Sequence, residues 1–166
     1  MGRENFAFEQ HPEWRIFPMR KALLLFAVLG LAGPLWAADP IIGTWKLNIA
    51  KSKFSPVLLA LQKQEAPKER TEVYRELDNG QIEFGINRSY TWPRQGGAAK
   101  VPKDYPYAVI EMLIAPGEWY AIFLKDGIQA RVIHKIVSKD GNTMTQTTNV
   151  VLFGQTIEEI TVYDKQ

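Results

Sequence analysis

The stretch EWYAIFLKDGIQARVIHKIVSKDGNTMTQTTNV (118–150) decides the fold that we expect for this chain of 166 residues. Apolar and polar side chains alternate along it, which is typical of strands with one buried and one solvated face. Asp-Gly steps at 126–127 and 140–141 divide the stretch into three segments. Because Asp and Gly both tolerate positive φ, such steps favour the tight turns of β-hairpins. The stretch therefore predicts three consecutive antiparallel strands.

The same alternation continues on both sides of this stretch, with further turn signals between the segments. The sequence predicts eight strands: 43–49, 68–77, 81–92, 107–115, 118–125, 128–138, 142–153 and 155–164. A meander of sequential hairpins has two exposed edges, and closure into a barrel removes both. We therefore expect an all-β fold, an antiparallel up-and-down β-barrel.

Two segments depart from the alternation. SPVLLALQKQEA (55–66) is the one short helix that we expect, directly after the first strand. Ser55 can cap its first turn, and Pro56 suits the first helical position. PRQGGAAKVPKDYP (93–106) is rich in proline and glycine and predicts a long loop.

The N-terminal part of the chain has the pattern of a secretory signal peptide. Met19-Arg20-Lys21 is a positive start, ALLLFAVLGLA (22–32) is an apolar run, and Ala37 and Ala38 offer a cleavage site. A transmembrane anchor is the alternative. The run is shorter than the roughly 20 residues that a spanning helix needs, and Gly33-Pro34 interrupts it. We expect cleavage after Ala37 or Ala38 and a periplasmic or secreted protein.

The remaining chain, 39–166, would then be a single domain. Residues 1–18 precede the signal, and we interpret them as an upstream extension from a start placed too early. The chain has 20 Lys and Arg against 18 Asp and Glu, so its charge gives no indication of nucleic-acid binding. It has no cysteine, which excludes disulfides and a lipid-modified cysteine. We expect no stable membrane span after cleavage.

Gly43-Thr44-Trp45 opens the first expected strand and resembles the Gly-x-Trp opening of the calycins, which include lipocalins and fatty-acid-binding proteins. The resemblance implies a calycin-like barrel in which Trp45 plugs the closed end and the 55–66 helix covers the mouth. VYDKQ (162–166) resembles the last strand of fatty-acid-binding proteins, where an Arg-x-Tyr pair contacts the ligand. Here Tyr163 matches, whereas Thr161 stands at the position of the arginine.

Three longer motifs resemble a group of small exported bacterial proteins of unassigned function. These motifs are GTWKLNxAKSKFSP (43–56), VSKDGxTMTxTT (137–148) and VYDKQ (162–166). They cover both ends of the expected domain, while its middle matches poorly. The resemblance implies export and the barrel fold, and it implies no activity.

Two charged residues are expected on apolar faces. Arg88 shares its face with Phe84, Tyr90 and Trp92, and Glu111 lies between apolar neighbours. Because a buried charge needs a partner, these two residues and His134 would form an internal polar cluster, or Arg88 would meet an anionic ligand group. In the alternative, Arg88 extends to the barrel mouth and keeps its guanidinium in water.

His134 is the one histidine after the signal segment, and it alternates in phase with Ile128, Val132 and Ile136. The phase predicts that it points inward. We favour a hydrogen-bonded core histidine over a pocket residue that orients a ligand or titrates near neutral pH. A single histidine without cysteine predicts no metal site.

The sequence contains no nucleophile elbow, phosphate loop or dinucleotide fingerprint. This favours a non-catalytic protein without a cofactor over an undetected hydrolase or isomerase. We expect the barrel to bind a small, apolar or amphipathic molecule. The expected contacts are Phe84, Arg88, Tyr90, Trp92, Glu111, Phe123, His134 and Tyr163. The alternative is an envelope structural or protein-interaction module with a filled barrel, for which the sequence names no partner.

Overall fold

A computed structural model describes residues 38–86 and 89–166. The predicted signal segment, the upstream extension and Arg88 therefore lie outside the described residues. Ala38–Gln166 form one compact unit.

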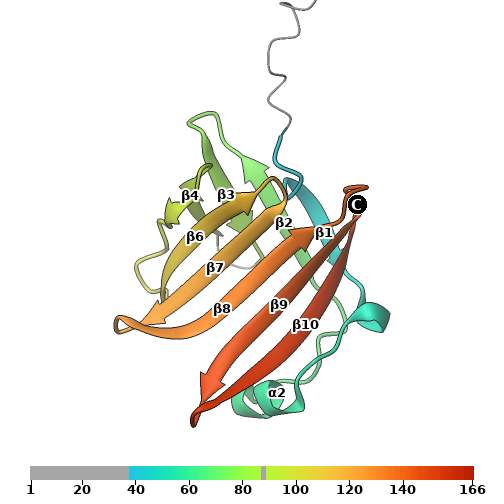
Figure 1. The fold of residues 1–166 in the computed structure, drawn as a ribbon, viewed down its shortest axis with the longest axis vertical. Coiled ribbons are helices and arrows are strands. Elements are labelled where there is room, and N and C mark those ends of the chain that lie inside the picture. The colour runs from blue at the N-terminus through green and yellow to red at the C-terminus, as the bar shows by residue number, and fades with distance from the viewer. Residues whose placement is uncertain (1–37, 87–88) are drawn as a thin grey trace, which may run out of the picture. The chain divides into compact units, whose positions relative to one another are not determined.

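The described part of the chain is an antiparallel meander of ten strands that forms a nearly closed barrel (Figure 1). In space the strands follow the order β4-β3-β2-β1-β10-β9-β8-β7-β6-β5. The first strand of the chain, β1, therefore pairs with the last, β10. This confirms the predicted all-β barrel, with ten strands in place of about eight. Their bounds are β1 (Gly43–Leu47), β2 (Thr71–Glu76), β3 (Gln81–Gly85), β4 (Ser89–Pro93), β5 (Gly97–Ala98), β6 (Ala108–Ala115), β7 (Glu118–Lys125), β8 (Ile128–Val137), β9 (Thr143–Leu152) and β10 (Gln155–Lys165).

The prediction of one strand over 81–92 was wrong, because this segment is a hairpin of β3 and β4. The expected face is nevertheless right, because Phe84 pairs with Tyr90 and Ile82 with Trp92. Cross-strand partners point to the same face of a sheet. The alternation therefore stays in phase through the reversal, which is why the sequence did not reveal it.

The predicted loop 93–106 contains the short strand that closes the barrel. β5 pairs with β6, and two residues later Lys100 pairs with Thr91 of β4. The N–H of Lys100 donates to the carbonyl of Thr91 over 2.7 Å, and the N–H of Thr91 donates back over 3.2 Å. Main-chain hydrogen bonds thus link the two ends of the meander, so neither is left as a long open edge.

The predicted helix forms over a shorter range, as α2 (Pro56–Gln62). The Ser55 hydroxyl accepts a hydrogen bond from the N–H of Leu58, and Pro56 occupies the first turn, as expected. Lys63 ends the helix in the left-handed conformation, with φ of 51°. A short 3-10 helix, η1 (Ile49–Lys51), precedes it. Figure 1 shows α2 at one end of the barrel, near the turn between β9 and β10.

Three tryptophans, Trp45, Trp92 and Trp119, are fully buried in the core. The indole Nε1 of Trp45 donates a hydrogen bond to the carbonyl of Ile41 over 2.7 Å. The rings of Trp92 and Trp119 meet edge to face, with centroids 6.0 Å apart. Trp45 is therefore a core residue, and the plugging role that the resemblance implies for it stays a prediction.

Candidate functional site

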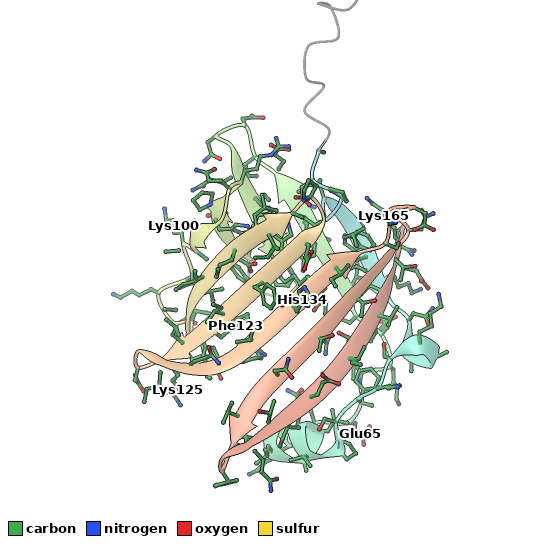
Figure 2. All side chains as sticks on the ribbon, in the orientation of Figure 1. Glu65, Lys100, Phe123, Lys125, His134 and Lys165 are labelled. Carbon is green, nitrogen blue, oxygen red and sulfur yellow. The ribbon has the colours of Figure 1, made fainter. Side chains whose placement is uncertain are left out.

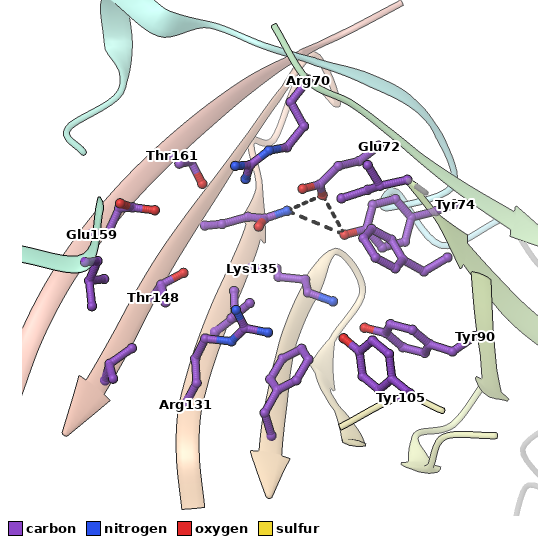
Figure 3. Close-up of a pocket in the computed structure, with 17 residues that line it drawn as sticks. Arg70, Glu72, Tyr74, Tyr90, Tyr105, Arg131, Lys135, Thr148, Glu159 and Thr161 are labelled. Atoms are coloured by element: carbon purple, nitrogen blue, oxygen red, sulfur yellow. Dashed lines mark hydrogen bonds between the residues drawn. The ribbon is translucent and has the colours of Figure 1, made fainter. Parts of the chain in front are cut away.

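The barrel encloses a cavity of about 200 Å³ (Figure 3). None of the three buried tryptophans lines it, so it occupies a different part of the interior. Its wall combines aromatic side chains with charged and hydroxyl groups. The lining residues are Leu58, Arg70, Glu72, Tyr74, Phe84, Ile86, Tyr90, Tyr105, Phe123, Arg131, Ile133, Lys135, Gln146, Thr148, Val150, Glu159 and Thr161.

One polar network in this wall centres on Glu72, whose side chain is buried. Its carboxylate accepts hydrogen bonds from the hydroxyl of Tyr74 over 3.1 Å and from the amide of Gln146 over 2.6 Å (Figure 3). It also accepts one from the hydroxyl of Tyr163 over 2.7 Å. Burial and the nearby Glu72 carboxylate raise the pKa of both tyrosines above its ordinary value. The hydroxyls therefore stay protonated and serve as donors.

A second network joins Glu111 to Lys135, and both side chains are buried. The ammonium of Lys135 lies 3.2 Å from each carboxylate oxygen, and the hydroxyl of Tyr90 donates to the same carboxylate over 2.9 Å. Burial raises the pKa of Glu111, against the opposing effect of Lys135. Glu111 therefore lies in a buried polar cluster, but its partners there are Lys135 and Tyr90 and not the expected His134.

Like Arg70, which donates to the hydroxyl of Tyr163, Arg131 lines the cavity without an ion pair to a carboxylate among the described residues. Its guanidinium carbon lies 4.0 Å from the ring centroid of Phe123 and 5.8 Å from that of Tyr107. Its Nε is buried and makes no hydrogen bond. Its strand neighbours across the sheet are Phe123 and Val150, which are apolar. Among residues 38–86 and 89–166, no carboxylate forms an ion pair with it.

A β-bulge explains why Arg131 and Lys135 point inward. The strands β7 and β8 pair as Lys125 with Ile128 beside the turn, but as Phe123 with Arg131 further along. One extra residue of β8 is inserted between these pairs. A shift of one residue turns every later side chain to the opposite face. Without the bulge, the Asp-Gly turn would place Ala130 opposite Phe123 and turn Arg131 outward.

The inward orientation predicted for His134 was wrong for the same reason. His134 lies on the outer face of the sheet (Figure 2), where its ring stacks on Tyr120 with centroids 4.2 Å apart. Its Nε2 lies 2.9 Å from a carboxylate oxygen of Glu118. It takes no part in the cavity or in the Glu111 cluster.

The other expected contacts fall into three groups. Phe84, Tyr90 and Phe123 line the cavity. Trp92 and Glu111 are fully buried behind its wall, and Tyr163 is linked to it through hydrogen bonds to the lining residues Glu72 and Arg70. Arg88 lies outside the described residues.

Sequence reasoning missed most of the charged wall. The charged lining residues are Arg70, Glu72, Arg131, Lys135 and Glu159, and Gln146 adds an amide. Charged and amide side chains in alternating strands usually mark the solvent face, and that expectation fails in this barrel. One signal was present: Glu72 alternates in phase with Tyr74, which is buried.

No family model matches the chain, and no curated protein matches it. Within the described residues, no helix is both long and apolar enough to cross a membrane. In the same part of the chain, no three His, Asp or Glu side chains are grouped so as to hold a metal ion. The fold and the cavity together define a barrel-shaped antiparallel β protein, consistent with a lipocalin-like fold.

Proposed function

We propose that this protein is an exported, non-catalytic barrel that binds a small, partly apolar molecule in its interior. The observation that carries the proposal is the cavity of about 200 Å³ with aromatic walls. Binding sites of β-barrels lie in such interior cavities. Export rests on the signal-like segment and on the resemblance to small exported proteins.

The size of the cavity limits the ligand. Pockets that enclose drug-sized molecules measure about 300–1,000 Å³, which exceeds this cavity. A second hollow of about 150 Å³ adjoins it and shares Leu58, Arg131 and Val150 with it. The ligand is therefore small, or it extends from the first hollow into the second.

Helix α2 borders both hollows and would cover a ligand bound there. Leu58, on α2, lines both hollows and is buried. The N–H of Ser55 at the start of the helix donates to the Glu159 carboxylate of β10 over 3.1 Å. This contact attaches one end of the helix to the barrel, while Leu61 lines the second hollow and stays half exposed.

Native mass spectrometry tests the proposal on protein expressed from the full-length gene and purified without detergent. We expect a discrete extra mass that disappears after organic extraction. Val150→Trp fills both hollows and should abolish the extra mass. Val151→Trp is the matched control, because Val151 is the next residue and is 55% exposed. A ligand-free mass, with no uptake of added apolar compounds, contradicts the proposal.

A second candidate function is an interaction module, and the outer face of β6, β7 and β8 favours it. Met112, Ile114 and Ile136 on these strands are 44–52% exposed. The half-buried Ile122 and Val132 pair between them on the same face. Clustered apolar surface of this kind often marks a protein contact. Sedimentation velocity of the wild type and of Ile136→Lys tests it: a single monomeric species in both contradicts self-association.

A further inference from the structure

We infer that the ligand carries an anionic group, a carboxylate or a phosphate, which Arg131 binds, and that its apolar part occupies the hollow beneath α2. The inference rests on the proposed function and specifies the ligand class of the same cavity. It is carried by a cation that lines the cavity without a counter-ion among the described residues.

The cations of the cavity wall differ in their partners. Lys135 pairs with Glu111, and Arg70 donates to Tyr163 over 3.3 Å beside the Glu72 network. Arg131 has only the faces of Phe123 and Tyr107 as partners. A guanidinium stays charged in proteins, and placing a charge in an apolar surrounding is unfavourable unless an anion or hydrogen bonds compensate it. A ligand anion would supply that compensation.

The hydrogen-bonding edge of the Arg131 guanidinium is vacant. The Nε of Arg131 is buried and has no acceptor. Its Nη groups make no hydrogen bond within the described part of the chain, and Figure 3 shows the guanidinium directed into the cavity. A guanidinium offers parallel N–H groups that match the two oxygens of a carboxylate or phosphate. The vacant edge therefore suits an oxyanion.

On the side away from the polar cavity, Arg131 borders the second hollow. The second hollow is lined by Leu58, Leu61, Ala130, Val150 and Leu152, together with Tyr107 and Arg131. Apart from the tyrosine hydroxyl and the guanidinium, these side chains are apolar. Arg131 thus stands between the polar cavity and an apolar hollow. A molecule with one anionic end and a short hydrocarbon chain fits both.

Isothermal titration calorimetry with three probes of equal chain length tests the inference. The probes are decanoate, decyl phosphate and the neutral decanol. We expect at least one of the two anions to bind about 10-fold or more tightly than decanol. A charge-assisted hydrogen bond is stronger than a neutral one by a free energy that corresponds to about this ratio of affinities. The stronger anion then distinguishes carboxylate from phosphate as the recognised group.

Variants locate the anion. Arg131→Gln should lose the preference for the anion while it still binds decanol, and Arg131→Lys should keep part of the preference. Lys125→Gln, which removes an exposed lysine at the end of β7, is the matched control and should change nothing. Circular dichroism checks that each variant is folded.

The outcomes separate the two proposals. Equal affinity for all three probes, a preference that survives in Arg131→Gln, or a neutral ligand in the native mass spectrum overturns the inference and leaves the proposed function standing. No binding of any probe, together with a ligand-free native mass, overturns both.

Discussion

The buried Glu111–Lys135 pair allows a quantitative test of how this barrel holds charge in its core. In Lys135→Met, an uncharged side chain of similar length replaces an ammonium that lies 3.2 Å from both carboxylate oxygens. Glu111 is fully buried, and within the described residues the hydroxyl of Tyr90 is its remaining hydrogen-bond donor. An unpaired buried carboxylate is so unfavourable that we expect Glu111 to become protonated in the folded variant.

Protonation sets the size of the expected destabilisation. The ordinary pKa of this carboxyl is 4.5, and each pH unit above it adds about 1.4 kcal/mol to the cost of keeping the proton. The free energy of unfolding should therefore fall by about 3 kcal/mol at pH 7, but by less than about 1 kcal/mol at pH 5. Because the folded variant holds the carboxyl at a raised pKa, its stability is greatest below pH 4.5 and decreases as the pH rises towards that raised value.

Urea unfolding at pH 5 and pH 7, followed by tryptophan fluorescence, measures both values. Lys125→Met removes an exposed lysine and serves as the control. Adding Glu111→Gln to Lys135→Met should restore most of the loss at pH 7, because a neutral amide replaces the carboxyl. Equal destabilisation at both pH values, or no recovery in the double variant, would refute the reasoning.

Three further predictions concern Arg131, the bulge and the aromatic core. Arg131→Met should raise the free energy of unfolding of the ligand-free protein by about 1 kcal/mol in urea, because it removes an uncompensated cation. Deletion of Ala130 should remove the bulge and keep Arg131 pointing inward, whereas deletion of Val132 should remove the bulge and turn Arg131 outward. In calorimetry, the variant without Ala130 should keep the preference for anionic probes, and the variant without Val132 should lose it. Trp45→Ala should cost about 3–5 kcal/mol in urea unfolding, because it empties a fully buried site.

The position of the charged side chains also distinguishes this barrel from one filled by apolar packing. The carboxylates of Glu72 and Glu111 each accept three hydrogen bonds from protein donors, which orient the surrounding tyrosines, Gln146 and Lys135. Arg131 stands apart from both networks. The paired polar groups would keep the wall in place around the unpaired guanidinium to which we propose that the ligand binds.

The sequence by itself determined the features that depend on near neighbours. Alternation with a period of two predicted the strands apart from the β3–β4 reversal and β5, Asp-Gly steps predicted two of the turns, and Ser55 with Pro56 predicted the start of α2. These signals act over a few residues, so they can be read without the rest of the fold. The antiparallel barrel follows from them, since sequential hairpins leave edges that closure removes.

Tertiary structure alone decided which side chains the barrel contains. A single residue inserted in β8 reverses its faces, placing Arg131 and Lys135 inside and His134 outside. The apolar pattern of 128–136 indicates the opposite orientation. The pairing of β8 with β7 and β9 overrides it and places Lys135 opposite Gln146. Inside the barrel Lys135 meets Glu111 of β6, and Gln146 meets Glu72 of β2. Because those partners lie 24 and 74 residues apart along the chain, no local pattern could reveal them.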